Sequence, residues 1–165
     1  MKQTIKIALL VFGVLLLQIT LVARVSVFGA KADLPLALIV AVALLKGPFH
    51  GEMTGFFSGF LCDLVSGGPL GIQAFSRTLI GYCAGFIRGR LYSDNIVTQA
   101  VSGFVATLAG KLITSVHLSL LSTDAQFMRI PFLGVILVAL LNSIFVVIIF
   151  WILKKVIKSE TYMGL

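Results

Sequence analysis

The chain has 165 residues, of which 59% are hydrophobic and only 12% are charged. Soluble domains carry about a quarter charged residues, so this composition excludes an ordinary water-soluble domain and predicts one all-α membrane domain. The net charge of +7 comes from basic residues that lie mainly between apolar runs, without interleaved aromatics. This placement predicts membrane topology and contact with anionic lipid in a bilayer, and argues against nucleic-acid binding.

Six apolar segments predict a bundle of six transmembrane helices, and the first covers residues 5–23. It is long for a signal-peptide core and no A-x-A pattern follows it, so a retained helix is expected. A polar connection, residues 24–33, leads to the second span, residues 34–45. Residues 46–50 break the chain before the third span, residues 51–65. These two spans are shorter than the roughly 17 residues of a normal crossing, so a tilted pair and a shallower hairpin are both open.

The second half of the chain contains the other three spans. The breaker residues 66–69 predict a tight turn before the fourth span, residues 70–87. Residues 88–95 are polar, and the fifth span covers residues 96–121. After another loop, the sixth span covers residues 131–153 and ends in a basic tail.

The basic residues between the spans predict the orientation of the bundle. With six crossings and both termini in the cytoplasm, eight basic residues fall inside and three outside, as the positive-inside rule requires. Five crossings would place the basic C-terminus outside. The inner set is Lys2, Lys6, Lys46, Arg88, Arg90, Lys154, Lys155 and Lys158, and the outer set is Arg24, Lys31 and Arg129.

Glycines recur every four residues in the third and fourth spans, and so share one face of each helix. Glycine lets two helix backbones approach closely in lipid. Two interpretations are open and can both be true: packing within the bundle, and a groove that accepts the helix of a partner. The glycines are Gly51, Gly55 and Gly59 in the third span, and Gly81, Gly85 and Gly89 at the fourth.

Three charged residues lie within the spans: Asp63, Arg77 and Lys111. Asp63 and Arg77 lie at similar depth on either side of the turn, so we expect them to face each other. Charges in a membrane usually pair or line a polar cavity. A clamp between the two helices and a polar cavity or partner contact are therefore both open. Lys111 needs a carboxylate as well, and Asp63 is its candidate acceptor in competition with Arg77.

Catalytic and metal-binding patterns are not visible in the sequence. Cys62 and Cys83 lie in apolar runs and lack metal-ligand spacing, so we expect buried thiols. His50 is expected in a loop. No nucleophile–base set or phosphate-binding loop is recognisable, which predicts a protein that is not an enzyme and has no cofactor.

The stretch from Thr54 to Gly71 resembles the signature region of the MreD family of rod shape-determining proteins, G-F-x-x-G-x-x-x-D-x-x-S-G-x-x-L-G. Leu34-Pro35 and Ile80-Gly81-Tyr82 also look like features of its second and fourth spans. The loop after the first span is short for the family. The matching residues are Gly55, Phe56, Gly59, Asp63, Ser66, Gly67, Leu70 and Gly71.

The resemblance implies a place in the cell-wall elongation machinery, in the bacterial cytoplasmic (inner) membrane. It implies a non-enzymatic scaffold or regulator that binds the single-span protein MreC. The larger complex would include RodA, a class B penicillin-binding protein and the filament protein MreB. The family's fold resembles the S-component of energy-coupling-factor vitamin transporters, so the same fold is expected here.

The rival hypothesis follows from that fold: a substrate-binding S-component that captures a vitamin or another small molecule. Such a binder should gather polar and aromatic groups at the outer ends of its spans. The outer loops are short, and the single tryptophan, Trp151, lies at the inner end. These observations weigh against the rival.

Overall fold

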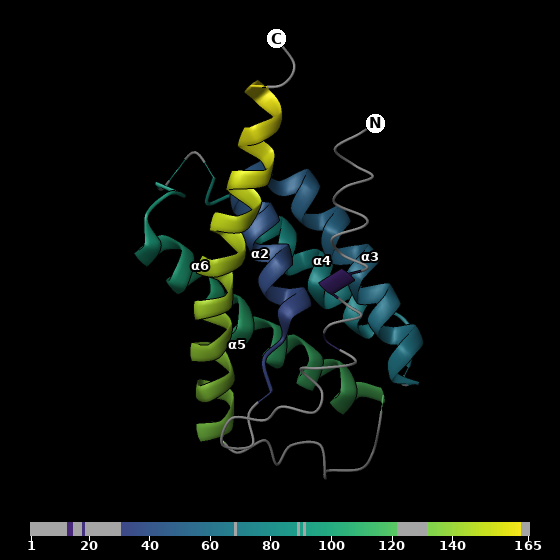
Figure 1. Cartoon of the computed structure of the whole chain (residues 1–165). Helices are drawn as coiled ribbons and strands as arrows, with labels where there is room; N and C mark the ends of the chain where they lie inside the picture. The colour runs from purple at the N-terminus through teal and green to yellow at the C-terminus, as the bar shows by residue number, and fades with distance from the viewer. Residues whose placement is uncertain are drawn as a thin grey trace.

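The computed structural model describes residues 13, 14, 18, 31–67, 69–88, 90, 92–121 and 132–162. The predicted first span and the loop after the fifth fall almost entirely outside these residues. Five helices make up the described part of the chain (Figure 1). They are α2 (Leu34–Lys46), α3 (Pro48–Ser66), α4 (Ile72–Gly85), α5 (Ile96–Leu121) and α6 (Phe132–Tyr162).

The helices follow the predicted spans closely, with two differences. The break expected over residues 46–50 shrinks to Gly47, whose φ of 91° suits glycine. Pro48 then starts α3, because proline's fixed φ and missing N–H fit the first position of a helix. His50 therefore lies in the first turn of α3, and the expectation of a loop histidine is wrong. At the other end, α6 continues past the predicted end at Leu153 to Tyr162.

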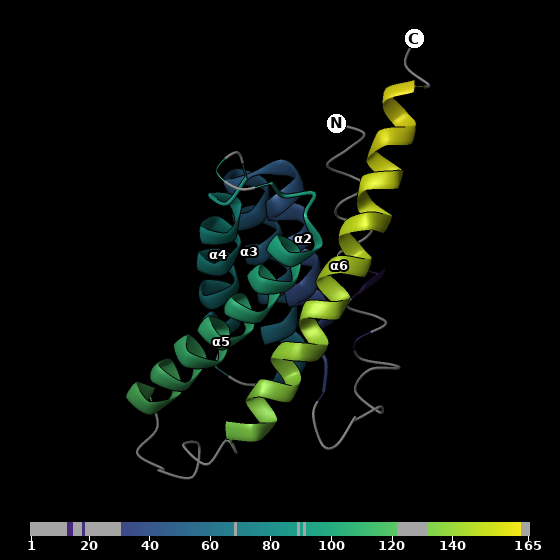
Figure 2. The same cartoon turned by 90° about the vertical axis from the view of Figure 1, so that its left-hand side faces the viewer.

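Membrane-spanning character is clearest in the last two helices. Ile96–Val116 in α5 and Leu133–Val156 in α6 are each long and apolar enough to cross a bilayer. The third apolar helix, α2, is shorter. The count of six crossings, and the position of both termini, stay predictions. In Figure 2, α6 projects well beyond the ends of the other labelled helices.

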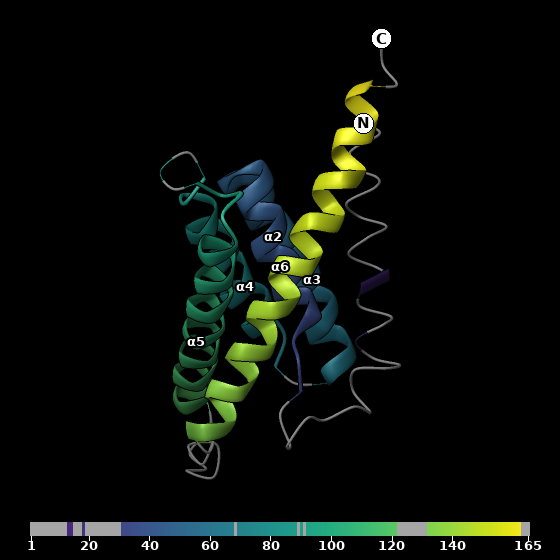
Figure 3. The same cartoon turned by 60° about the vertical axis from the view of Figure 1, so that its left-hand side comes forward.

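The centre of the bundle is α2. Every residue from Pro35 to Leu44 is buried, because α3, α4, α5 and α6 all pack against this one helix. Figure 3 shows it enclosed between its neighbours. A helix that is apolar on all sides belongs in an interior, and 13 residues give it a length of only about 20 Å. The short predicted second span is thus a core helix.

The two glycine rows meet face to face between α3 and α4. A Cβ at Gly51 or Gly55 would collide with the backbone of Gly81 or Arg77 respectively. A Cβ at Gly59 would lie 2.5 Å from the carbonyl oxygen of Gln73, and one at Gly85 would collide with Pro48. Each row is therefore filled by the other helix, and the alternative of a partner's helix seated on these glycines does not hold.

Candidate functional site: a buried polar network

The turn between α3 and α4 is closed by Asp63, whose side chain is only 2% exposed. Its carboxylate accepts hydrogen bonds from the backbone N–H groups of Gly71 (3.0 Å), Gln73 (3.1 Å) and Ala74 (3.1 Å). These donors belong to the first turn of α4, where N–H groups have no partner within the helix. Gly71 cannot cap them because it has no side chain. Asp63 thus caps α4 from the neighbouring helix, and its charge lies at the positive end of the helix dipole.

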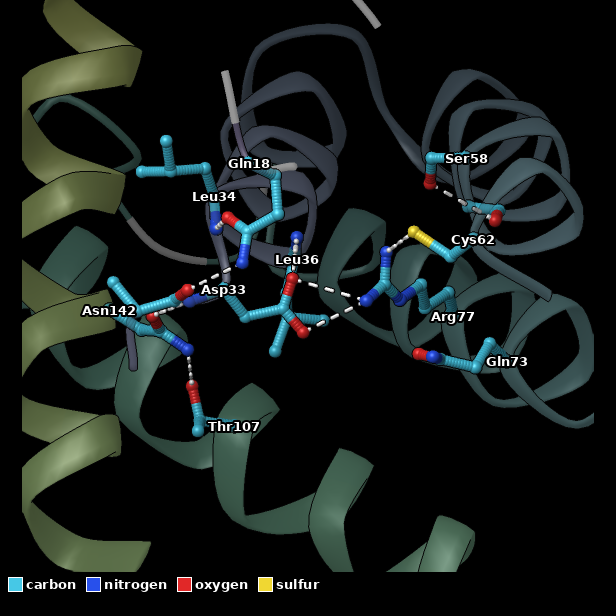
Figure 4. Close-up of polar contacts among 12 residues, drawn as sticks. Gln18, Asp33, Leu34, Leu36, Ser58, Cys62, Gln73, Arg77, Thr107 and Asn142 are labelled. Carbon is cyan, nitrogen blue, oxygen red and sulfur yellow. Dashed lines mark hydrogen bonds and ion pairs between the residues drawn. The ribbon is translucent and has the colours of Figure 1, made fainter. Parts of the chain in front are cut away.

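The expected ion pair between Asp63 and Arg77 is not formed. Arg77 instead pairs with Asp33, with 2.9 Å between the guanidinium Nη2 and the nearer carboxylate oxygen. Its Nη1 donates a hydrogen bond to the Sγ of Cys62 at 3.1 Å (Figure 4). The Arg77 side chain is 8% exposed and the Asp33 side chain 31% exposed, so the pair joins a buried guanidinium to a half-buried carboxylate. The expectation failed because Asp33 was assigned to a loop, whereas the start of α2 carries it between α4 and α6.

Asp33 is the centre of a network of hydrogen bonds at the start of α2. Its carboxylate caps α2 by accepting from the N–H of Leu36 at 3.1 Å. Its own N–H donates to the side-chain oxygen of Asn142 on α6 at 2.8 Å. The amide of Asn142 then donates to the hydroxyl of Thr107 on α5 at 3.1 Å. One short segment thereby ties α2 to α4, α5 and α6 (Figure 4).

Gln18 adds a contact from the N-terminal part of the chain. Its side-chain amide donates to the carbonyl of Ala32 at 2.8 Å, and its oxygen accepts from the N–H of Leu34 at 3.1 Å. The backbone on both sides of Asp33 is therefore held by one glutamine (Figure 4). Polar groups buried in a bundle are costly unless they are hydrogen-bonded, and this network satisfies them.

A small cavity of about 150 Å³ lies beside this network. Its wall includes positions 73, 76, 77 and 80 of α4 and positions 107, 110, 111 and 114 of α5, which are single faces of the two helices. Lys111 is on this wall. The two ion pairs of the described residues, Arg77–Asp33 and Lys154–Asp94, do not include it. Its expected acceptor, Asp63, instead accepts bonds from the backbone of α4.

Other expectations about polar residues have mixed outcomes. Cys62 is half-buried beside Arg77, but Cys83 is exposed, so the expectation of two buried thiols is wrong for Cys83. Sequence reasoning missed Asp33 and Thr107 as partners in the network. The signal for Asp33 was present: an aspartate two residues before a proline marks the start of a helix. Among the described residues, no group of three metal-ligand side chains is found.

The comparisons with known proteins give one match. The model of a family described as rod shape-determining protein MreD matches residues 2–156. This range includes the Asp63 cap, the Asp33 network and all five described helices except the end of α6. In the comparisons with curated proteins and with solved structures, no chain matches this one. The likeness to the S-component fold stays a prediction.

Proposed function

The chain belongs to the MreD family of rod shape-determining proteins, and from this premise we propose that it is a non-enzymatic membrane scaffold of the cell-wall elongation complex. It binds MreC, and the two act with RodA, a class B penicillin-binding protein and MreB in a larger complex. The observation that carries the proposal is the family match, which extends over nearly the whole chain. The same match supports a place in the bacterial cytoplasmic membrane.

The use of the buried charges supports a scaffold. Asp63 is committed to capping α4, and Arg77 and Asp33 are committed to each other. A catalytic acid or base needs access to a substrate and a pKa matched to proton transfer. Carboxylates that fix the ends of helices instead stabilise a rigid structure. A rigid frame suits a protein whose task is to position partners.

The outer face of α3 is the best candidate binding surface for the single transmembrane helix of MreC. Because the glycine faces of α3 and α4 are filled, a partner must use a face that the bundle leaves exposed. Helices associate in lipid through van der Waals packing, and large rigid aromatic rings give much contact area. Phe56 and Phe60 stack on this face with ring centroids 6.2 Å apart. The exposed residues of the face are Phe49, Met53, Phe56, Phe57, Phe60 and Leu64.

Co-purification in mild detergent tests the proposal. Wild-type protein should recover MreC, and the double variant Phe56→Ala/Phe57→Ala should lose about tenfold or more of it, because aromatic hot spots contribute about 2 kcal/mol or more. The matched control is Val105→Ala/Leu112→Ala on the exposed face of α5, which should recover MreC normally. Wild-type protein that recovers no MreC would contradict the function. Equal recovery by both variants would contradict only the choice of face.

The rival function, capture of a vitamin, has one observation in its favour, which is the polar cavity beside Arg77 and Lys111. Its volume of about 150 Å³ weighs against that function. Sites for drug-sized ligands usually measure about 300–1,000 Å³, so this cavity is too small to enclose a vitamin. Co-purification of a bound vitamin or an ATPase module would favour the rival.

A further inference from the structure

One end of the bundle gathers basic residues around a second hollow. Here α2 ends and α5 begins, and α6 passes beside them at Phe150 and Lys154 before it continues to Tyr162. The hollow measures about 540 Å³. The basic residues at this end are Lys46, Arg88, Arg90, Lys154 and Lys155.

The wall of the hollow has a charged side and an apolar side. Arg88 and Arg90 line it together with Tyr92 and Ser93, while Leu44, Leu45 and Phe150 form the apolar part. The exposed Arg88 side chain passes over Gly47, where a Cβ would lie 3.4 Å from its Nη1 atom. Arg90 lies over the ring of Phe86, 5.8 Å from its centroid. Both arginines are therefore supported by neighbouring groups.

The charges at this end are not balanced. Asp94 also lines the hollow, but it pairs with Lys154 at 2.7 Å. Burial, and to a smaller extent the positive charge of Arg88, lower the pKa of Lys46. With Asp94 neutralised by Lys154, the two arginines leave the hollow with a net positive charge. An anion that enters would relieve this repulsion.

We propose that this hollow binds the phosphate of an anionic phospholipid, with Arg88 and Arg90 on the headgroup and the half-buried Leu45 beside its acyl chains. Arginine matches phosphate with two parallel hydrogen bonds. Leu45 offers a lipid an apolar contact that a free phosphate cannot use.

Aromatic residues at the same end place the hollow at headgroup level. Tyr92 is 87% exposed, and Trp151 lies under the Nζ of Lys154 at 5.1 Å from the ring centroid. Tyrosine and tryptophan concentrate at membrane–water interfaces, and basic residues there attract anionic lipid. The hollow thus opens where phospholipid headgroups lie, at the end that the positive-inside rule assigns to the cytoplasm.

The test uses the full chain in nanodiscs of phosphatidylglycerol mixed with phosphatidylcholine. Native mass spectrometry after release counts the retained phosphatidylglycerol. Each arginine lost should weaken this binding about fivefold, so Arg88→Gln/Arg90→Gln should weaken it by about 25-fold. The matched control is Lys155→Gln, which removes a cation at the same end but outside the wall, and it should bind as the wild type does.

Three results would overturn the proposal. One is equal retention of phosphatidylglycerol by the double variant and by Lys155→Gln. A second is equal retention of phosphatidylcholine and phosphatidylglycerol by the wild type. The third is displacement of the lipid by the same concentration of soluble glycerol phosphate, which would assign the hollow to free phosphate. Should the double variant fail to fold, Arg90→Gln alone, at an exposed position, must still show the fivefold loss.

Discussion

The two buried charges of the α3–α4 hairpin serve different partners, and their roles follow from which donor each can reach. Asp63 faces three backbone N–H groups at the start of α4, and a carboxylate in that position is stabilised without any cation. Arg77 lies one turn further along α4 and reaches the start of α2, where it pairs with Asp33. Breaking such a buried pair leaves an uncompensated charge, which is strongly destabilising.

A double-mutant cycle separates the two arrangements. We expect Asp33→Asn and Arg77→Ala to couple by about 1–3 kcal/mol in the free energy of unfolding, because residues in one network are not additive. Asp63→Asn and Arg77→Ala should add to within about 0.5 kcal/mol, since the two side chains share no bond. Reversible unfolding in detergent gives the values. Strong coupling of Asp63 to Arg77, with none for Asp33, would show that the assignment is wrong.

At the level of helices, the sequence predicts where the elements lie far better than which of them touch. Apolar periodicity and breaker residues such as Gly47 and Pro48 are local signals, and α2, α4 and α5 lie close to their predicted bounds. The four-residue glycine spacing also predicted a close approach of α3 and α4. The Asp33 network was not predictable in the same way. It depends on where α2, α5 and α6 meet, and on residues such as Asn142 that are 109 positions away.

Close contact between α3 and α4 makes Gly55 intolerant of even one methyl group. Its Cβ would collide with the backbone of Arg77, and backbone cannot move aside as a side chain can. Gly55→Ala should lower the free energy of unfolding by about 1–3 kcal/mol, the usual cost of overpacking. The control is Gly13→Ala, where a Cβ would meet nothing within 4 Å. Thermal melts in detergent that show equal stability for the two variants would contradict the close packing.

For the molecule as a whole, the basic end and the long α6 distinguish one end of the bundle from the other and predict its orientation in the membrane. Arg88 and Arg90 line the hollow together with Asp94, which pairs with Lys154 of α6. In Figure 2, α6 projects beyond the other labelled helices. At 31 residues α6 is about 46 Å long, whereas the hydrocarbon core of a bilayer is about 30 Å thick. The apolar stretch of α6 ends at Val156, so we expect the turns after that residue to extend out of the membrane.

Cysteine labelling in intact cells checks this orientation. Lys158→Cys should resist a membrane-impermeant maleimide added from outside, because the positive-inside rule places the end of α6 in the cytoplasm. The same variant should react after the membrane is permeabilised, which controls for burial of the thiol. Background labelling is removed by replacing Cys62 and Cys83 with serine. Efficient labelling of position 158 in intact cells would reverse the topology.

The complete enclosure of α2 has a consequence for how the protein is made. At 13 residues this helix is shorter than the stretch that inserts readily by itself, and its residues from Pro35 to Leu44 are buried against other helices. Yet the ribosome synthesises α2 long before α5 and α6, which form two of its walls. During translation, the packing around α2 is therefore incomplete until α6 has been synthesised. A chain truncated before α6 exposes this unfinished centre and should be recognised by membrane quality-control proteases.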